Sequence, residues 1–407
     1  MTAQRTIAVF TGNRAEYGLQ LPILRAIQAH PDLRLLLFVS GAHLDPDFGR
    51  TKSEIEADGF TIDAEIRIDM PTDSLIGTAY AIGSGVLSMT DALVIHKPDM
   101  LVVYADRFEG FAAVIAGTQM GLPTAHIEGG DVTEGGALDD SVRHAMTKLA
   151  HLHFTTNQQA SNRLLAMGEE PWRVHTVGLP AIDLIVAGEV AGPDEIRERT
   201  GIDPDRPLVV FTQHSVATQF DRAASQLAPS LEALERLAAE GVQIVLTYPN
   251  NDAGGRRIIE RLDAFGARGL SNVLVRSSLG RHLYHGMLAL ARDPARRVVC
   301  AGNSSSGIKE TPAFGCPAVD IGSRQEGRLR GGNVLETPYD ASDIEAALRT
   351  ALFDEAFREA ARTAPNPYGL GGAGVKVAEA IAGVVLDERL IRKGMTLRGE
   401  ACEGWFR

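Results

Sequence analysis

Short apolar runs alternate with longer helical patterns along most of this chain, and this alternation limits the possible folds more than any other feature. The runs include TIAVF (6–10), LRLLLFVS (33–40) and LVVY (101–104), and helix-like segments such as EYGLQLPILRAIQAH separate them. Runs without alternating polar residues are typical of strands buried on both faces, as in a parallel sheet covered by helices. The sequence therefore predicts an α/β fold built on parallel sheets.

The length of the chain and a break in the alternation indicate two domains. A chain of 407 residues is too long for a single hydrophobic core. The alternation breaks at 177–207, which is rich in Pro, Gly and charged residues, and restarts at LVVFT; beyond Asp340 the pattern is mostly helical. We therefore expect an N-terminal domain over 1–185, a second domain over 186–368, and a final helix with a tail over 369–407.

Composition and charge narrow the range of partners. Hydrophobic residues make up 44% and charged residues 23% of the chain, as in soluble globular proteins. The net charge of −12 argues against general nucleic-acid binding and against binding to anionic membranes, since both favour a basic surface. A few local arginines are still enough to hold a phosphate. No run of about 18 uncharged apolar residues is present, so we expect no membrane span.

The cysteine and histidine patterns do not predict a metal site. Cys300, Cys316 and Cys402 form no CxxC pair, which argues against a disulfide framework or a structural zinc site. His151 and His153 alternate along HLHF with no carboxylate or cysteine at ligand spacing, so we expect both to be structural. The first residues contain no segment resembling a signal peptide. We expect a cytoplasmic protein that uses no metal.

Three carboxylates stand at the ends of predicted strands or at the start of a helix. Asp106 follows LVVYA, Glu128 follows PTAHI, and Asp140 lies in the first turn of DDSVRHAMTKLA, where helical spacing places His144 on the same face and Arg143 beside it. Ligands of open parallel sheets bind at the carboxyl ends of the strands. The carboxylates could therefore converge as acid/base groups. Alternatively, acids in a first helical turn simply suit the helix dipole.

Residues suited to an anion also follow predicted strands. Arg14 lies in TGNRAEYG, His214 follows LVVFTQ, and the run GNSSSG begins at Gly302, where a strand gives way to a predicted helix. Free N–H groups at the start of a helix favour a phosphate, although a serine run can also be no more than a helix cap. Glu310 is placed to accept hydrogen bonds from a ribose, and Arg324 follows another strand. The lack of GxGxxG here disfavours a dinucleotide-dependent dehydrogenase.

Several of these segments together resemble the hydrolysing UDP-N-acetylglucosamine 2-epimerases. The matching text is TGNRAEYG, ADRFEG, HIEGGD, DDSVRHAMTKLAHLHF, GNSSSGIKETPAFGCP and IGSRQEGR, in the order of the family and over roughly residues 5–385. The resemblance implies a GT-B architecture. Two Rossmann-like domains would hold the nucleotide in the cleft between them, chiefly on the C-terminal domain, and the last helix would pack back on the N-terminal domain.

The resemblance also implies a reaction. UDP-N-acetylglucosamine and water would give N-acetylmannosamine and UDP through a glycal, for the synthesis of sialic-type acids. No cofactor would take part, and a homo-oligomer, a dimer or a tetramer, would be usual. By motif position, the acid/base carboxylates of the family match Asp106, Glu128 and Asp140, and we add His214 to the catalytic set.

The resemblance also implies which residues contact the UDP-sugar. By motif position, the family's nucleotide-binding set falls on Arg14, His214, Ser304, Ser305, Glu310 and Arg324. The substrate-binding set that we expect also includes Arg107, Arg143, His144, Gly302, Asn303 and Ser306.

Departures from the family pattern leave the substrate open. The segment GGDVTEGGALDD is longer than in many members of the family, QHS replaces QHP, and the tail after about residue 386 has no counterpart. The sugar could therefore be a UDP-linked 2,4-diacetamido-2,4,6-trideoxyglucose or a GDP-linked relative. A non-hydrolysing epimerase, a GT-B glycosyltransferase with an acceptor site and a catalytically dead nucleotide-sugar sensor are further alternatives.

Overall fold

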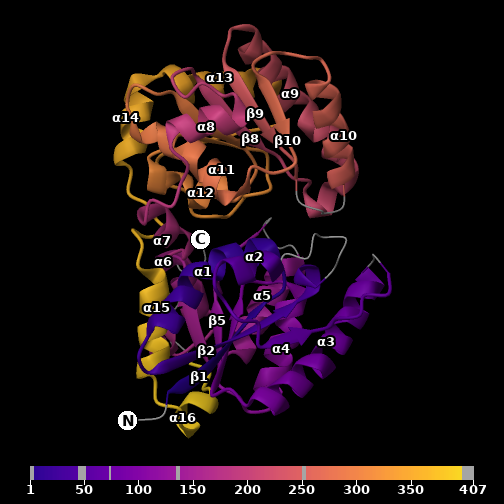
Figure 1. Cartoon of the computed structure of the whole chain (residues 1–407), viewed down its shortest axis with the longest axis vertical. Helices are drawn as coiled ribbons and strands as arrows, with labels where there is room; N and C mark the ends of the chain where they lie inside the picture. Colours follow the sequence, from indigo (N-terminus) through magenta and orange to yellow (C-terminus); the bar gives the residue numbers. More distant parts are fainter. Residues whose placement is uncertain (1–3, 45–51, 73–74, 134–137, 250–253, 397–407) are drawn as a thin grey trace. The chain divides into compact units, whose positions relative to one another are not determined.

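The computed structural model describes residues 4–44, 52–72, 75–133, 138–249 and 254–396. The chain divides into two compact units, shown in Figure 1. The N-terminal unit comprises Met1–Asp131, Leu138–Asp183 and Tyr368–Arg407, and the C-terminal unit comprises Val132–Ala137 and Leu184–Pro367.

The N-terminal unit is built on a parallel sheet of seven strands in the order β3-β2-β1-β4-β5-β6-β7. Neighbouring strands are parallel throughout this sheet. The strands are β1 (Arg5–Thr11), β2 (Leu33–Ser40), β3 (Ala64–Ile66), β4 (Met100–Tyr104), β5 (Thr124–Ile127), β6 (Leu152–Thr155) and β7 (Val174–Thr176). The order 3-2-1-4-5-6 is that of a Rossmann fold.

Helices connect these strands, and two more return from the end of the chain. They are α1 (Arg14–Ala29), η1 (Gly41–His43), α2 (Lys52–Ala57), α3 (Leu75–His96), α4 (Phe108–Gln119), α5 (Leu138–Leu149), α6 (Gln158–Ala166), η3 (Pro171–Arg173), α15 (Ala373–Gly383) and α16 (Glu388–Ile391). α15 packs against α1. At this contact Gly374 lies so close to Pro22 that a Cβ would sit 2.5 Å from the Pro22 carbonyl oxygen.

The C-terminal unit repeats the design with a parallel sheet of six strands in the order β10-β9-β8-β11-β12-β13. The strands are β8 (Leu208–Thr212), β9 (Gln243–Thr247), β10 (Val273–Arg276), β11 (Val298–Gly302), β12 (Ala318–Ile321) and β13 (Val334–Thr337). The helices are α8 (Pro193–Thr200), η4 (Ala217–Arg222), α9 (Ala223–Ala239), α10 (Gly255–Gly266), α11 (Gly280–Ala289), η5 (Leu290–Arg292), α12 (Ser306–Lys309), η6 (Thr311–Phe314), α13 (Ala341–Phe353) and α14 (Glu355–Thr363). A further helix, α7 (Ala181–Val186), crosses the boundary between the units.

Strand β8 shows why the apolar runs do not alternate with polar residues. Val209 and Phe211 belong to one hydrophobic cluster of the C-terminal unit, whereas Leu208 and Val210 belong to another, and all four side chains are fully buried. Successive side chains of a strand point to opposite faces, so both faces of this sheet are covered. The predicted parallel α/β fold is confirmed.

Three short strands were not predicted from the sequence, and each lies at the edge of a sheet. They are β3, β7 and β13, which are three or four residues long. Edge strands contact a neighbour on one side only and need fewer apolar residues. The helix predicted after the serine run is short, since α12 has four residues and leads directly to η6.

Helix α3 differs from the expectation that no segment is long and apolar enough to span a membrane. Its residues Ile76–His96 have a mean hydropathy of 1.3, so this helix is long and apolar enough to cross a bilayer by length and composition, although only 28% of that stretch is buried. The sequence criterion missed it because Asp91 interrupts the uncharged run. Length and composition alone are weak grounds for a membrane span, because the core helix of a soluble protein passes the same test.

Candidate active site

The sheet topology marks one place in each unit where a ligand is expected. In the N-terminal unit β1 lies between β2 and β4, and in the C-terminal unit β8 lies between β9 and β11. At these two positions the strand order reverses, and ligands of open α/β sheets bind at the carboxyl ends of the strands there. The residues predicted from the sequence lie at these positions: Asp106 follows β4, His214 follows β8, and Asn303 follows β11.

Arg143 brings two of the predicted carboxylates together. Its buried guanidinium binds Asp106 and donates a hydrogen bond of 2.8 Å to Asp140 through Nη1. Nη1 also donates to the carbonyl oxygen of Asp131 at 2.8 Å. The side chains of Arg143, Asp106 and Asp140 are 3%, 17% and 7% exposed. The two carboxylates are thus held in fixed positions by one planar cation.

The third carboxylate, Glu128, stands on a strained turn directly after β5. Its φ is 65°, and that of Ala105, which follows β4, is 55°, although neither residue is glycine. The left-handed conformation is costly for residues with a Cβ, and such strain is concentrated at functional sites. The Glu128 N–H donates to Phe154 at 2.8 Å, and the Ala105 N–H donates to Ile127 at 2.9 Å. Both strained positions are therefore held by backbone bonds to neighbouring strands.

Tyr104, the last residue of β4, was not singled out from the sequence. Its side chain is almost fully buried. Burial, and then the charge of the nearby Glu128 carboxylate, raise the pKa of Tyr104 well above its usual range. The phenol is therefore protonated at neutral pH, and it places a neutral hydroxyl close to the carboxylate that follows β5.

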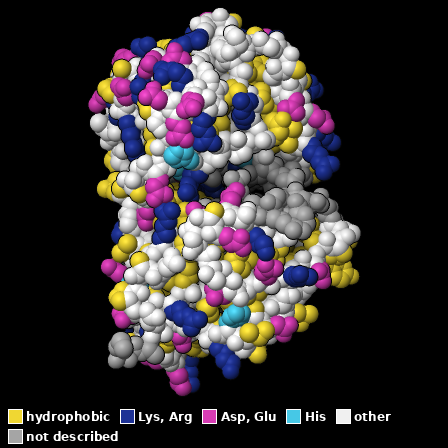
Figure 2. Space-filling view, in the orientation of Figure 1, with side chains coloured by type: hydrophobic (Ala, Val, Ile, Leu, Met, Phe, Trp, Pro, Cys, Tyr) yellow, Lys and Arg dark blue, Asp and Glu magenta, His cyan; other side chains and the backbone are white. Residues whose placement is uncertain are grey.

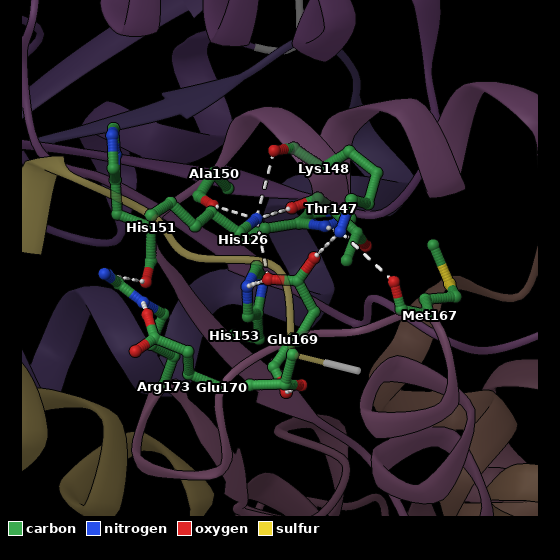
Figure 3. Close-up of polar contacts among 12 residues, drawn as sticks. His126, Thr147, Lys148, Ala150, His151, His153, Met167, Glu169, Glu170 and Arg173 are labelled. Atoms are coloured by element: carbon green, nitrogen blue, oxygen red, sulfur yellow. Dashed lines mark hydrogen bonds and ion pairs between the residues drawn. The ribbon is translucent and has the colours of Figure 1, made fainter. Parts of the chain in front are cut away.

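His126, shown in Figure 3, is a second residue that was not predicted from the sequence. It is fully buried in β5, and burial lowers its pKa to about 3, so the imidazole is neutral. Nε2 donates to the carbonyl oxygen of Ala105 at 2.7 Å. Nδ1 accepts from the hydroxyl of Thr147 on α5 at 3.1 Å. His126 therefore ties the turn that precedes Asp106 to the helix that carries Asp140.

A buried pair of glutamates lies beside the first strand end. Glu16 and Glu109 are 4% and 3% exposed. Glu16 accepts from the N–H of Gly12 at 3.3 Å and from Gln20 at 2.9 Å. Burial, and then the Glu109 charge, raise the pKa of Glu16 to about 8, so it is mostly protonated at neutral pH. Neither glutamate was predicted, because their closeness depends on how β1 and β4 are paired.

The predicted basic residues of the N-terminal unit fall in different surroundings. Arg107 donates to both oxygens of Glu109 at 3.3 Å while its side chain stays 48% exposed. His144 is half-buried, and its pKa is lowered by burial and then by the charges of Arg143 and Arg163. Arg14 opens α1, but its side chain lies outside the part of the chain that the structure describes.

In the C-terminal unit, the side chain of Asn303 joins the loops after β8 and β11. It accepts from the His214 N–H at 2.6 Å and donates to the His214 carbonyl oxygen at 2.9 Å. The Asn303 carbonyl oxygen accepts from Arg324 at 3.1 Å and from Gln325 at 2.8 Å. Asn303 is fully buried. The predicted residues His214, Asn303 and Arg324 therefore belong to one connected group.

The serine run follows a turn that only glycine allows. Gly302 has a φ of 116°, and a Cβ at this position would lie 1.9 Å from the carbonyl oxygen of Thr212. Beyond it, the Ser304 hydroxyl lies 3.1 Å from that of Ser306, which lies 2.6 Å from the Tyr284 hydroxyl. The side chains of the three serines are partly exposed, so they remain accessible to a ligand.

His214 was expected either to exchange protons or to hydrogen-bond an anion. It is buried, and burial, followed by the charge of Arg324, lowers its pKa to about 3. A histidine with this pKa is neutral at physiological pH. Its surroundings support the second expected role, in which the imidazole donates a hydrogen bond to an anion.

Glu310, which we expected to accept hydrogen bonds from a ribose, also has a partner within the chain. Its Oε2 accepts from Nε2 of His285 at 2.6 Å, and its side chain is 15% exposed. The remaining carboxylate oxygen has lone pairs for hydroxyl donors, while His285 holds the side chain in place. His285, which was not predicted from the sequence, therefore positions the carboxylate of Glu310.

The two histidines of HLHF, His151 and His153, form hydrogen bonds within the N-terminal unit (Figure 3). His153 donates to Glu169 at 2.9 Å, and both side chains are fully buried. Burial alone would raise the pKa of Glu169, but hydrogen bonds from His153, Lys148 and Lys393 lower it to about 2. His151 accepts from the Thr124 N–H at 3.0 Å. Among the described residues, no group of His, Cys, Asp and Glu is arranged to hold a metal ion.

The two parallel sheets, each with polar residues where its strand order reverses, define a pair of Rossmann-like domains of the GT-B class. Over residues 25–382 the sequence matches the UDP-N-acetylglucosamine 2-epimerase family. The chain belongs to this family.

Named relatives are similar to this chain over most of its length. A UDP-N,N'-diacetylbacillosamine 2-epimerase (hydrolyzing) of Legionella pneumophila is 32% identical over 389 residues, 96% of this chain and 98% of the relative. A UDP-N-acetylglucosamine 2-epimerase of Neisseria meningitidis is 31% identical over 351 residues, 85% of this chain and 87% of the relative. A GDP/UDP-N,N'-diacetylbacillosamine 2-epimerase (hydrolyzing) of Campylobacter jejuni is 31% identical over 345 residues, with the same coverage of 85% and 87%.

Solved structures confirm the predicted GT-B fold. The UDP-GlcNAc 2-epimerase from Neisseria meningitidis, bound to UDP-GlcNAc, superposes with a TM-score of 0.78 at 18% identity and covers 93% of this chain and 99% of its own. The S. aureus protein MnaA, solved with UDP, superposes with a TM-score of 0.75 at 18% identity, with coverage of 93% and 96%.

Proposed function

We propose that this protein is a hydrolysing 2-epimerase that converts a UDP-linked 2-acetamido sugar and water into the free 2-epimer and UDP. The observation that carries the proposal is the pair of carboxylates, Asp106 and Asp140, held by the buried Arg143 at the point where the strand order reverses. Glu128 follows the adjacent strand β5. A third carboxylate fits a reaction in which a carbon-bound proton moves, since plain glycoside hydrolysis needs only two.

In the proposed reaction a carboxylate removes the proton from C2, and the electrons of that C–H bond form the C1–C2 double bond of a glycal. The C1–O bond breaks at the same time, and its electrons leave with UDP. Water then adds across the double bond, so that its oxygen joins C1 and a proton returns to C2 on the opposite face. Asp106, Glu128 and Asp140 supply the proton donors and acceptors for these steps.

We propose that the strand-end residues of the C-terminal unit bind the nucleotide. The serines of the loop after β11, the imidazole of His214 and the guanidinium of Arg324 offer donors to a diphosphate, and Glu310 offers an acceptor to the ribose. Arg14, Arg107 and His144 complete the proposed contacts. Two relatives with solved structures were crystallised with UDP-GlcNAc or UDP, which supports a uridine nucleotide.

Two sugars are the leading candidates. The Legionella relative, which matches this chain over the greater length, is named for UDP-N,N'-diacetylbacillosamine, and the Neisseria relative is named for UDP-N-acetylglucosamine. The similarity of the Legionella protein over 96% of this chain favours the diacetamido sugar. In either case the product would enter the synthesis of a sialic-type acid, and we propose a cytoplasmic homo-oligomer.

A panel of nucleotide sugars tests the proposal. The purified protein is incubated, without any acceptor, with UDP-N-acetylglucosamine, UDP-N,N'-diacetylbacillosamine and the GDP-linked form of the latter. We expect free UDP and a 2-epimerised free sugar from one of the UDP-linked compounds. A non-hydrolysing epimerase would give the UDP-linked epimer instead, a glycosyltransferase would give little turnover without an acceptor, and a sensor would bind without turnover.

A further inference from the structure

Lys393, in the segment after α16, is a largely buried cation to which the proposed reaction gives no role. On the face of the protein shown in Figure 2, Lys and Arg side chains lie at the surface among those of Asp and Glu. The side chain of Lys393, in contrast, is only 13% exposed. A buried cation is stable only where protein acceptors replace the water that it has lost. The acceptors around Lys393 therefore indicate its role in the fold.

The ammonium group of Lys393 caps the carboxyl end of α5. Its Nζ donates to three backbone carbonyl oxygens there, those of Thr147 (2.7 Å), Lys148 (3.0 Å) and Ala150 (2.7 Å). The last carbonyl groups of a helix have no partner within the helix, and a cation near them also suits the helix dipole. Lys393 therefore holds one end of the helix whose first turn carries Asp140.

Glu169 compensates the charge of Lys393. Its Oε2 lies 2.7 Å from the ammonium nitrogen, and its side chain is fully buried. Burial lowers the pKa of Lys393 to about 8, and the hydrogen bond to Glu169 opposes this shift. The lysine is therefore mostly protonated at neutral pH and has three N–H donors. Figure 3 shows Glu169 close to Thr147, Lys148 and Ala150, the residues whose carbonyl groups Lys393 binds.

The segment that carries Lys393 is itself held against the N-terminal unit. Arg173, which is fully buried, donates to three backbone carbonyl oxygens within residues 389–392, at 2.7, 2.7 and 3.2 Å. Beyond the lysine, the Thr396 N–H donates to the carbonyl oxygen of Gly168 at 2.9 Å. Because the chain is bound on both sides of Lys393, the ammonium group has a set position at the end of α5.

Hydrogen bonds lead from the same end of α5 to the turn before Asp106. Thr147, whose carbonyl oxygen accepts from Lys393, places its hydroxyl 3.1 Å from Nδ1 of His126. Nε2 of His126 lies 2.7 Å from the carbonyl oxygen of Ala105, the residue before Asp106. Two residues therefore connect Lys393 to the backbone beside this carboxylate.

We infer that Lys393 is a positioning residue of the candidate active site. It fixes the end of α5 and, through Thr147 and His126, the turn that precedes Asp106. The inference rests on the proposed function, because it takes Asp106 and Asp140 as acid/base groups. Small displacements of such groups are costly to the chemical step. Since Lys393 acts through other residues, its loss should slow turnover and leave substrate affinity nearly unchanged.

The alternative is that Lys393 only stabilises the fold. A lysine that caps a helix and pairs with a buried glutamate can raise the melting temperature without any influence on the site. In that case every variant that is folded at the assay temperature would keep the wild-type kcat. Kinetics and stability of the same variants therefore separate the two roles.

Lys393→Met, which removes the ammonium group and keeps an unbranched side chain, is the first test. We expect kcat to fall on the order of tenfold or more, with KM changed by less than about twofold, at a temperature where circular dichroism shows a folded protein. The matched control is Lys376→Met, the same change at an exposed lysine of α15, which should keep both constants. A folded Lys393→Met protein with the wild-type kcat would overturn the inference.

A second variant keeps the test decisive if Lys393→Met does not fold. Combining it with Glu169→Gln removes both charges of the pair, so that no carboxylate is left buried without its cation. The end of α5 still lacks its cap in this protein, and we expect the same loss of kcat as for the single variant. Wild-type kcat in the folded double variant would contradict the role of Lys393.

A double-mutant cycle tests the route through Thr147. Thr147→Val removes the hydroxyl that reaches His126 and leaves the carbonyl oxygen that accepts from Lys393. We expect Thr147→Val to lower kcat in the wild-type background and to lower it much less in the Lys393→Met background, because both substitutions release the same turn. Equal factors in the two backgrounds would contradict this route.

Hydrogen exchange followed by mass spectrometry requires no substrate, so it separates this inference from the proposed function. We expect the amides of α5 and of residues 105–107 to exchange faster in Lys393→Met than in wild type, and at the wild-type rate in Lys376→Met. Wild-type exchange of both segments in Lys393→Met would overturn the inference. A wild-type protein that turns over no sugar of the panel would instead overturn the proposed function, and the exchange rates would still decide whether Lys393 fixes these segments.

Discussion

The Nη1 atom of Arg143 donates a hydrogen bond of 2.8 Å to Asp140, one turn earlier on α5, while the same guanidinium binds Asp106 at the end of β4. A lysine carries the same charge but has no planar fork with which to hold two carboxylates. We therefore expect Arg143→Lys to lower kcat on the order of 10²-fold with a smaller change in KM, since the positions of the acid/base groups are disturbed.

Steady-state kinetics with the substrate that the panel identifies would check this. Arg197→Lys, on the exposed surface of α8, is the matched control and should behave as wild type. Unchanged kinetics in Arg143→Lys would show that the carboxylates do not depend on the guanidinium fork.

Each of the three carboxylates is expected to be needed for turnover. Asp106→Asn, Glu128→Gln and Asp140→Asn keep the shape of the side chain and remove its ability to exchange a proton. We expect each to reduce kcat on the order of 10²-fold or more, which is typical of acid/base groups, with UDP affinity nearly unchanged. Single-turnover assays and calorimetry with UDP would measure the two quantities separately. Wild-type rates in all three variants would remove these residues from the chemistry.

The serine loop is expected to contribute to binding and not to folding. The double substitution Ser304→Ala and Ser305→Ala should weaken UDP binding by roughly 1–3 kcal/mol, which is the usual loss for hydrogen bonds to a charged group. The melting temperature should stay the same, because both side chains are partly exposed. Calorimetric titration of UDP decides the matter, with the exposed Ser225→Ala of α9 as the control. Unchanged affinity would exclude the two serine hydroxyls from the nucleotide site.

Glu16 is expected to make stability depend on pH. Its folded pKa of about 8 lies above its usual value of 4.5, so its contribution to stability is fully present below pH 4.5 and is lost as the pH rises to about 8. Glu16→Gln removes this dependence, and we expect it to stabilise the fold at pH 7 by about 3 kcal/mol relative to wild type. Urea unfolding of both proteins at pH 5 and pH 7.5 measures the difference, which should grow with pH. A constant difference would contradict the raised pKa.

The sheets could be predicted because their central strands are apolar runs that are recognisable from the local sequence. Residues 7–10 of strand β1 form an apolar run that is almost fully buried, and such runs are recognisable without knowledge of the rest of the chain. The segments AEI, VHT and VLET of β3, β7 and β13 carry no such signal. They are strands because a neighbouring strand offers them hydrogen bonds, and that depends on the tertiary fold.

The position of the candidate site could be predicted for a similar reason, since Asp106, Glu128 and His214 are recognisable as residues that follow strands. The residues that hold these side chains and their loops in place could not be predicted. His126 matters because its two nitrogens reach Ala105 and Thr147, on two different segments, and nothing in the sequence around it signals this. The low pKa of His214 likewise results from burial and from Arg324, which lies far along the chain.

The central claim, that the C2–H bond breaks during the reaction, is tested most directly by running the reaction in D₂O and examining the free sugar by NMR. The account predicts a 2-epimerised product with deuterium at C2, together with free UDP. A parallel reaction in H₂¹⁸O should place the label at C1, because glycal formation cleaves the C1–O bond. A product that keeps a fully protonated C2 and the configuration of the substrate would contradict the account and would identify the enzyme as a simple hydrolase.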